Sequence, residues 1–291
     1  MKIIELEQNS PEWLEFRYSK IGASDAPIIM GQSPFQTAHS LYWAKIEKIS
    51  QLQNYAMKKG HELEPKARDA FNIAIRELYK NESIDVKPLV VQSDEHDFII
   101  ASLDGIDMPN KILVEIKCPG SKDHSCAIEG RIPEKYYPQL QHQLYVTGYE
   151  KMLYASYYEG RVVILPCSRN NLFIQQMLTE EIAFMECIRT KIPPALVERD
   201  FDIREDPKFT SMALRYVECK KDLAMLQEEE ELLKRELISL SEEKNCVGGG
   251  IKVTHHVRRG SIEYTKIPEL QSLDLERYRK EPSRYSSISV I

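Results

Sequence analysis

The sequence contains no apolar run long enough to cross a membrane, since no stretch of its 291 residues approaches about 18 uninterrupted apolar side chains. Its first residues, Met-Lys-Ile-Ile-Glu-Leu-Glu, also lack the apolar block and small-residue cleavage site of a secretory signal. We therefore expect a cytoplasmic protein without a membrane partner. With 42% hydrophobic and 29% charged residues, the composition is that of a folded globular protein.

Cysteine is scarce and scattered, and no C-x-x-C pair occurs. This pattern argues against a zinc knuckle, a redox dithiol and a disulfide framework. We expect most of the six cysteines to be small buried apolar residues. They are Cys118, Cys126, Cys167, Cys187, Cys219 and Cys246.

The sequence also lacks a net positive charge. It holds 39 basic and 45 acidic residues, a formal balance of −6, which disfavours a protein that coats nucleic acid through bulk electrostatics. Residues 251–291 carry eight Lys and Arg against five Asp and Glu. Any DNA contact by the rest of the chain would therefore depend on a few placed cations and bound metal.

Helices and strands are predicted to alternate along residues 1–195. Apolar side chains three and four residues apart predict a helix over residues 62–79, and alternation predicts a strand over residues 112–117. The order of the elements favours an α/β fold with a mixed sheet flanked by helices. The other expected elements are a helix and turn over 12–26, helices over 137–147 and 172–191, and strands over 86–91, 98–102, 152–158 and 162–166.

Residues 196–291 differ in character, and Pro193-Pro194 marks the predicted boundary. A charged helix carries one stripe of leucines, which we interpret as packing on its own domain or a neighbouring helix rather than as an intermolecular coiled coil. Gly248-Gly249-Gly250 is expected to end this helix. A basic hairpin is then predicted, with strands in 251–257 and 261–264 around Arg258-Arg259-Gly260. The stripe consists of Leu223, Leu226, Leu233, Leu237 and Leu240.

Two acidic residues are predicted to face each other across a hairpin. If its strands turn around Pro109-Asn110, the same antiparallel register places Asp104 opposite Glu115, with Cβ atoms about 4.5–5.5 Å apart. Like charges at that separation repel, and a hard cation such as Mg²⁺ would replace the repulsion with coordination. The alternatives are a solvated acidic edge and a bulge that shifts the register.

Lys117 is expected on the same face as Glu115, because strand side chains alternate. Val114 and Ile116 then point into the core from the other face. Two acids and a lysine at one point can hold a metal, orient water and offset charge on a scissile phosphate.

Asp104 followed by Glu115-Ile-Lys117-Cys-Pro119 resembles the Asp…(Asp/Glu)-x-Lys signature of the PD-(D/E)XK, or restriction-endonuclease-like, nuclease superfamily. Within it, the pattern is similar to the lambda exonuclease and YqaJ-type viral recombinase family. The resemblance covers about residues 8–190. Three further blocks agree in order: Trp13-x-x-x-Arg17 with Ile21-Gly-Ala-Ser24, Gly60-His-Glu-Leu-Glu64-Pro-Lys-Ala-Arg68, and Tyr137-Pro-Gln139-Leu-Gln141-His-Gln-Leu-Tyr145-Val-Thr147.

The resemblance implies that Asp104, Glu115, Glu64 and the Ile116 carbonyl hold metal. Lys117 would activate water or stabilise the phosphate charge. Glu62 would be solvated, because two helical residues that are two apart cannot face one site.

Gln139 resembles the family's active-site glutamine, whereas Gln141 and Tyr145 fit the Gln-x-x-x-Tyr pattern of RecB-like nucleases. A terminal 5′-phosphate would be held by Arg17, Ser24 and Ser102, although Ser24 alone is also an ordinary helix cap. The histidines His61, His124 and His142 are expected at the surface or around the site, without a metal role.

The implied function is a Mg²⁺-dependent 5′-to-3′ exonuclease with two metal ions, for which Mn²⁺ substitutes. It would act on linear double-stranded DNA ends and leave 3′ overhangs for a single-strand annealing protein in phage-type recombination. The resemblance also implies a homo-oligomer, a ring-shaped trimer. Two alternatives stay open: a Cas4- or RecB-like single-strand nuclease, and a catalytically silent DNA-binding or interaction module. The lack of clustered cysteines for an iron–sulfur centre disfavours the Cas4 version.

Overall fold

The computed structural model of the chain describes residues 1–6, 10–49 and 55–258, together with residues 260, 261, 263, 266, 267, 273 and 280. The chain divides into two compact units, Met1–Phe201 and Asp202–Ile291. Among the described residues, no helix is long and apolar enough to span a membrane.

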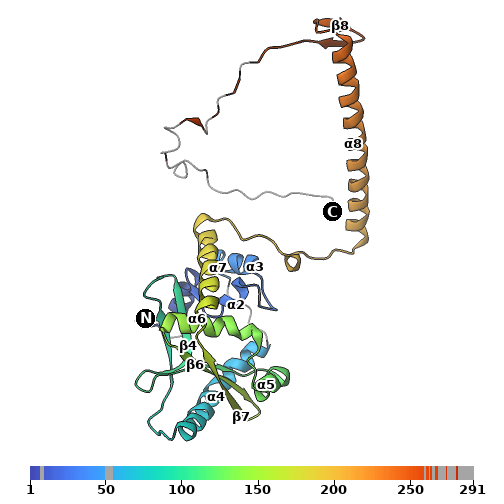
Figure 1. Cartoon of the computed structure of the whole chain (residues 1–291). Helices are drawn as coiled ribbons and strands as arrows, with labels where there is room; N and C mark the ends of the chain where they lie inside the picture. Colours follow the sequence, from blue (N-terminus) through green and yellow to red (C-terminus); the bar gives the residue numbers. More distant parts are fainter. Residues whose placement is uncertain are drawn as a thin grey trace. The chain divides into compact units, whose positions relative to one another are not determined.

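The first unit is built on a mixed seven-stranded sheet (Figure 1). Its strands run in the order β1-β3-β4-β5-β6-β7, and β2 pairs with β4 from outside this path. The β5–β6 and β2–β4 pairs are parallel, whereas the other pairs are antiparallel. The strands are β1 (Lys2–Ile4), β2 (Ile21–Gly22), β3 (Lys87–Gln92), β4 (Ile99–Asp107), β5 (Ile112–Lys117), β6 (Lys151–Tyr158) and β7 (Arg161–Ser168).

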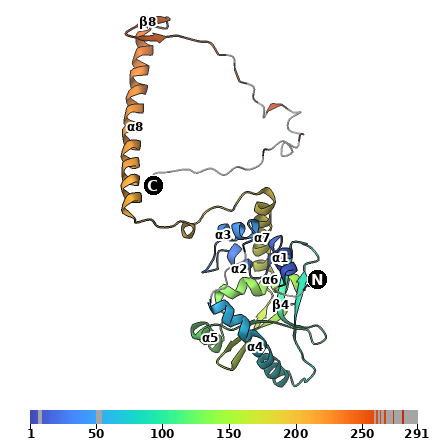
Figure 2. The ribbon, with the colours of Figure 1, turned by 180° about the vertical axis from the view of Figure 1, so that it is seen from behind.

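Helices cover both faces of this sheet (Figure 2). The long helix α4 packs against β5 and β7, while α6 packs against β3, β4 and β6 and also contacts α2 and α7. The predicted α/β class with a mixed sheet flanked by helices is confirmed. The helices are α1 (Pro11–Tyr18), α2 (Ala26–Ile29), α3 (Ala38–Ile46), α4 (Tyr55–Tyr79), α5 (Ser121–Ile128), α6 (Tyr137–Thr147) and α7 (Asn171–Thr190), with short 3₁₀ turns η1 (Glu134–Tyr136) and η2 (Glu198–Asp200).

Strand β5 directs alternate side chains to opposite faces of the sheet. Ile112, Val114 and Ile116 join the apolar cluster under α4. Glu115 lies on the opposite face, where it contacts α6. The predicted alternation is therefore confirmed.

The β4–β5 hairpin has the predicted register. Asp107 pairs with Ile112 and Gly105 with Val114. The same register, continued by one residue, places Asp104 opposite Glu115. The interpretation as a shifted, bulged register is wrong for this strand pair.

Several predicted boundaries need correction. Of the helix and turn expected over residues 12–26, the helix is α1, which ends at Tyr18, and strand β2 follows it, because Ile21 and Gly22 pair with the start of β4. Helix α4 begins before its predicted start, and β4 continues five residues past its predicted end. Helices α3 and α5 and strand β1 were not predicted.

The second unit contains helix α8 (Pro207–Leu240) and a hairpin of β8 (Cys246–Gly248) and β9 (Ile251–Val253). The hairpin turns at Gly249 and Gly250, whose positive φ angles of 57° and 82° suit glycine, rather than around Arg258-Arg259-Gly260. Of the second predicted strand, residues 262 and 264 lie outside the described residues, and the described 261 and 263 are not in a strand.

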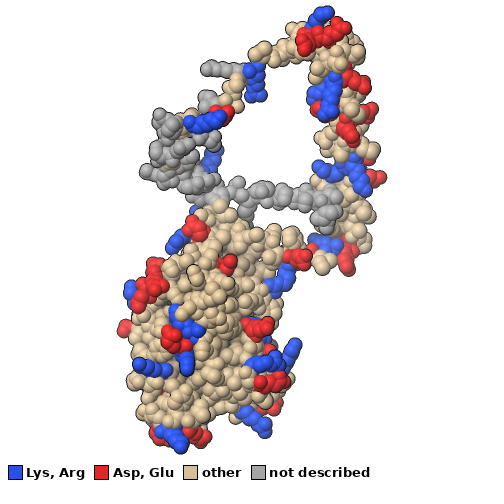
Figure 3. Space-filling model, in the orientation of Figure 1, with Lys and Arg blue, Asp and Glu red and all other residues tan. Residues whose placement is uncertain are grey.

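Helix α8 buries none of its 34 residues. Among the described residues of this unit, the predicted packing of the leucine stripe is not seen. The charges of α8 are mixed, and Figure 3 shows basic and acidic side chains interspersed along it.

The close packing of β4 beneath α4 generates a stability prediction. A Cβ at Gly105 would lie 2.7 Å from Val114 Cγ1 and from Val86 Cγ2, so Gly105→Ala requires the core to shift. We expect the free energy of unfolding, measured by urea denaturation, to fall by about 1–3 kcal/mol. The control is Gly60→Ala in α4, where a Cβ meets nothing within 4 Å. That change should instead stabilise by about 0.5–1 kcal/mol, and a loss of similar size in both variants would contradict the packing argument.

Candidate active site

One cavity of about 1070 Å³ gathers the residues predicted for the site. Strands β4 and β5, helix α6 and the α1–α2 region contribute to its wall. The nine predicted residues that line it are Arg17, Ser24, Glu64, Ser102, Asp104, Glu115, Ile116, Lys117 and Gln139.

Glu115 is a buried carboxylate of the cavity that three side chains hold. It is 1% exposed, and its Oε1 accepts from Gln139 Nε2 at 2.6 Å and lies 2.5 Å from Lys117 Nζ. Its Oε2 accepts from Gln143 Nε2 at 2.5 Å. Gln139 and Gln143 are four residues apart, so both project from one face of α6. The carboxylate is thus held from two elements at once.

Asp104 lies next to this group. Its Oδ2 accepts the Ile116 backbone N–H at 2.9 Å. Burial and the neighbouring Glu115 carboxylate raise the pKa of Asp104, and Lys117 opposes that rise. Burial would lower the pKa of Lys117, but Glu115 and Asp104 raise it above its ordinary value. Lys117 is therefore a fixed cation at neutral pH.

Arg68 connects α4 with the acidic pair. Its Nη2 lies 2.5 Å from Glu64 Oε1, and its Nε donates to the Asp104 carbonyl at 2.8 Å. Glu64 therefore reaches the cavity with its carboxylate held by Arg68. Glu62 is exposed, as predicted.

A second cluster lies where α1 meets α2. Arg17 Nη2 donates to Ser24 Oγ at 2.5 Å and lies 3.4 Å from Asp25 Oδ1. Asp25 and Lys45 are both buried, with Lys45 Nζ 2.8 Å from Asp25 Oδ2. The Arg17 guanidinium also lies 5.1 Å from the ring centre of Trp13. These contacts fix Arg17 at the cavity wall. Ser24 is exposed and is not the cap of α2, whose first residue follows Asp25.

Gln141 and Tyr145 lie away from this cavity. Gln141 Nε2 donates to the Ser168 carbonyl at 2.9 Å, and its Oε1 accepts from the Asn170 N–H. The Tyr145 hydroxyl donates to Glu95 at 2.9 Å. Between the two predicted glutamines, the structure brings Gln139 to Glu115.

His124 and His142 are both buried, so the surface position that was one of the two expected for them is wrong. His142 bonds Glu181 at 2.7 Å and the Ile100 carbonyl at 2.8 Å, and His124 bonds Ser156. The side chain of His61 lies outside the described residues. His255 contacts Ser241 Oγ.

Sequence reasoning missed four contacting residues. The four-residue spacing from Gln139 was a signal for Gln143, and Arg68 stood in a quoted motif without a role. Nothing in the local pattern indicated the buried pair of Asp25 and Lys45, because its members come from separate helical segments.

The donor set suits Mg²⁺ in chemical type. Asp104, Glu115 and Glu64 offer carboxylate oxygens and Ile116 a carbonyl, which are the hard ligands this ion takes. Within the described part of the chain, no three His, Cys, Asp or Glu side chains already form a metal-binding group. The contacts above explain this, since Arg68 holds Glu64 while lysine and glutamines occupy Glu115.

The buried Asp25–Lys45 pair generates a prediction about stability. Asp25→Asn would leave Lys45 buried without its counter-charge, and loss of one partner of such a pair costs about 3–5 kcal/mol. We expect that loss in the free energy of unfolding at pH 7, measured by urea denaturation. Asp69→Asn, an exposed carboxylate on α4, should change it by less than about 0.5 kcal/mol.

The same pair predicts a pH dependence. Burial would raise the pKa of Asp25, but Lys45 and Arg17 lower it to about 2. A carboxyl with a depressed folded-state pKa contributes stability above its ordinary pKa and loses it as the pH falls through the folded value. The gap between wild type and Asp25→Asn should therefore narrow by about 2 kcal/mol between about pH 5 and pH 2. A constant gap would contradict the ion pair.

The chain is similar to several known proteins. Residues 12–150 match the model of the YqaJ-like viral recombinase domain. The uncharacterized protein YqaJ of Bacillus subtilis (strain 168) is 29% identical over 183 residues, which are 61% of this chain and 56% of that protein. The chain thus spans little more than half the length of this relative.

Two crystal structures of an alkaline exonuclease, LHK-Exo, have a similar fold. The structure of the Laribacter hongkongensis protein is 25% identical, and the complex with dAMP is 23% identical. Each gives a TM-score of 0.52 and covers 63% of this chain and 94% of the other. The predicted resemblance to the YqaJ-type viral recombinase family is confirmed, because residues 12–150, which contain the whole predicted site, match the model of that family's domain.

Proposed function

We propose that the chain is a magnesium-dependent nuclease that digests linear double-stranded DNA from its 5′ ends and leaves 3′ overhangs for recombination by strand annealing. One observation carries this proposal: a single cavity joins the Asp104–Glu115–Lys117 centre to the cluster around Arg17. One DNA strand could then place a phosphodiester at the Asp104–Glu115–Lys117 centre and its terminal phosphate at the cluster around Arg17. The similar Laribacter hongkongensis protein is an alkaline exonuclease, which supports this assignment.

The residues of the Asp104–Glu115–Lys117 centre would have different roles in phosphodiester hydrolysis. Lys117, held protonated by Glu115 and Asp104, places a compact positive charge where negative charge develops on the phosphate. Gln139 and Gln143 orient Glu115, and the Ile116 N–H orients Asp104. Bound at Asp104, Glu115 and the Ile116 carbonyl, with Glu64 nearby, Mg²⁺ would act as a Lewis acid and activate water.

The second cluster would recognise the end of the strand. Arg17 and Ser24 offer a guanidinium and a hydroxyl 2.5 Å apart, and Ser102 adds a hydroxyl from β4. Such donors suit a dianionic terminal phosphate. Lys135 also lines the cavity, so a protein of net charge −6 offers local positive charge to DNA there. This cluster supports the proposed 5′ polarity.

The RecB-like alternative loses its structural support, because Gln141 and Tyr145 are engaged elsewhere. A DNA-binding module without catalytic activity would not need a buried Glu115 that three side chains hold beside a second carboxylate. We retain the annealing protein as the proposed partner that would receive the 3′ strand.

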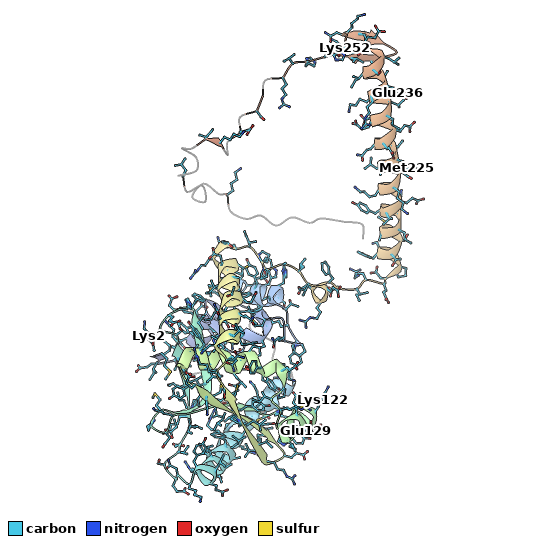
Figure 4. All side chains as sticks on the ribbon, in the orientation of Figure 1. Lys2, Lys122, Glu129, Met225, Glu236 and Lys252 are labelled. Atoms are coloured by element: carbon cyan, nitrogen blue, oxygen red, sulfur yellow. The ribbon has the colours of Figure 1, made fainter. Side chains whose placement is uncertain are left out.

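Lys117→Ala tests the proposed chemistry. Without the cation that offsets phosphate charge, we expect the rate of nucleotide release from end-labelled linear duplex with Mg²⁺ to fall roughly 100- to 1000-fold. The control is Lys122→Ala, which removes an exposed lysine on nearby α5 (Figure 4) and should leave the rate unchanged. Unfolding curves would verify that both variants fold. Digestion at the wild-type rate by a folded Lys117→Ala protein would refute the assignment.

Arg17→Ala tests the recognition of the strand end. Charge-assisted hydrogen bonds contribute about 1.5–3 kcal/mol, so we expect the preference for 5′-phosphorylated over 5′-hydroxyl duplex to fall at least roughly tenfold. The readout is the ratio of the two digestion rates. Lys48→Ala, at an exposed lysine paired with Glu15, should keep the wild-type ratio. If Arg17→Ala slows both substrates equally, Arg17 does not hold the terminal phosphate.

A further inference from the structure

The Lys117 ammonium has a second contact besides Glu115, the ring of Tyr136. The Nζ atom lies 5.5 Å from the centre of this ring, within the range of a cation–π interaction. Tyr136 ends the 3₁₀ turn η1, lines the cavity and precedes Gln139 by three residues. The proposed catalytic lysine therefore contacts an aromatic ring as well as a carboxylate.

Other elements fix the position of the Tyr136 ring. It stacks on the ring of Tyr154 in β6, with the ring centres 5.9 Å apart and an interplanar angle of 28°. Tyr154 is fully buried and pairs with Glu115 across the parallel strands, so its ring lies on the face of the sheet that carries Glu115 and Lys117. The Tyr136 hydroxyl donates to Asp123 Oδ2 of α5 at 3.3 Å. The place of the ring is therefore set by β6 and α5 rather than by the lysine.

A second lysine contacts the same ring but has an anchor of its own. Lys135 Nζ lies 5.1 Å from the centre of the Tyr136 ring and 2.5 Å from Asp123 Oδ2. The Asp123 carboxylate therefore compensates the charge of Lys135. Lys117, in contrast, shares its carboxylate partner with the proposed metal.

Glu115 alone is an insufficient anchor for Lys117, because it is also a proposed metal ligand. Its Oε1 already accepts from Gln139 at 2.6 Å and lies 2.5 Å from Lys117 Nζ. A cation bound at this carboxylate would compete with the ammonium for the same oxygen. The face of the Tyr136 ring attracts the ammonium without using a carboxylate oxygen.

We propose that Tyr136 is a positioning residue for phosphodiester hydrolysis: its ring holds the Lys117 ammonium where negative charge develops on the phosphate. This inference rests on the proposed function, because Tyr136 acts through Lys117. A cation that is already in place stabilises the developing charge without reorganisation during the reaction. Loss of the ring should therefore slow the chemical step and leave DNA binding unchanged.

Substitution of Tyr136 in the full-length chain tests this role through kcat and KM for digestion of linear duplex with Mg²⁺. Tyr136→Phe keeps the ring and should change kcat by less than about twofold. Tyr136→Leu removes the ring, so kcat should fall roughly 3- to 30-fold while KM stays unchanged. If the leucine variant does not fold, Tyr136→Met takes its place, because methionine fills space flexibly without a ring.

The matched control is Tyr149→Leu. Tyr149 is also a half-buried tyrosine that packs against the same core cluster, but it does not line the cavity. This variant should retain the wild-type kcat. Equal losses in Tyr136→Leu and in either Tyr136→Phe or Tyr149→Leu would overturn the inference, and so would a raised KM with an unchanged kcat.

A double variant separates the positioning of Lys117 from a general packing role. A Lys117→Ala chain has no ammonium to position, so adding Tyr136→Leu should lower its residual kcat by less than about twofold. Two losses that multiply would overturn the inference. A normal loss in Lys117→Ala without a loss in Tyr136→Leu would overturn the inference alone, whereas a folded Lys117→Ala chain with the wild-type rate would refute the catalytic assignment as well.

A measurement on metal-free protein follows the lysine itself. The rate at which an amine-acylating ester modifies Lys117, read by mass spectrometry, should rise at least roughly twofold in Tyr136→Leu, because the ring no longer covers the ammonium. It should stay unchanged in Tyr136→Phe. Lys122, an exposed lysine on α5, is the internal reference. An unchanged Lys117 reactivity in Tyr136→Leu would overturn the inference, and this readout does not depend on nuclease activity.

Discussion

The first unit depends on one electrostatic constraint, the burial of Glu115 beside Asp104. Removing a carboxylate from water costs several kcal/mol unless donors and counter-charge compensate. Here one lysine and two glutamine amides supply them. Those contacts fix three features together: the alternation of β5, the face of α6 that turns to the sheet, and the register of the β4–β5 hairpin. A shift of one residue in any of them would leave an uncompensated buried charge.

At the other end of the cavity a buried carboxylate is also paired with a cation, but there a second cation stays partly exposed. The Asp25–Lys45 pair is almost fully buried, so it is a structural pair, whereas Arg17 keeps about a third of its side chain exposed. Asp25 thus holds the Arg17 guanidinium from the buried side, and the other side of the guanidinium stays accessible to the cavity. This explains how an acidic protein can present positive charge to a phosphate: the cations are positioned locally, by carboxylates behind them.

The sequence predicted what depends on short-range regularity. The period of two in β5 and the turn at Pro109-Asn110 were sufficient to place Asp104 opposite Glu115, whereas Gln139 was indicated by the family resemblance and not by spacing on α6. Contacts between distant segments left no such signal: the His142–Glu181 pair spans 39 residues and looks like ordinary polar helix positions. The family resemblance indicated the residues proposed to bind the strand end, but not the buried Asp25–Lys45 pair that contacts Arg17.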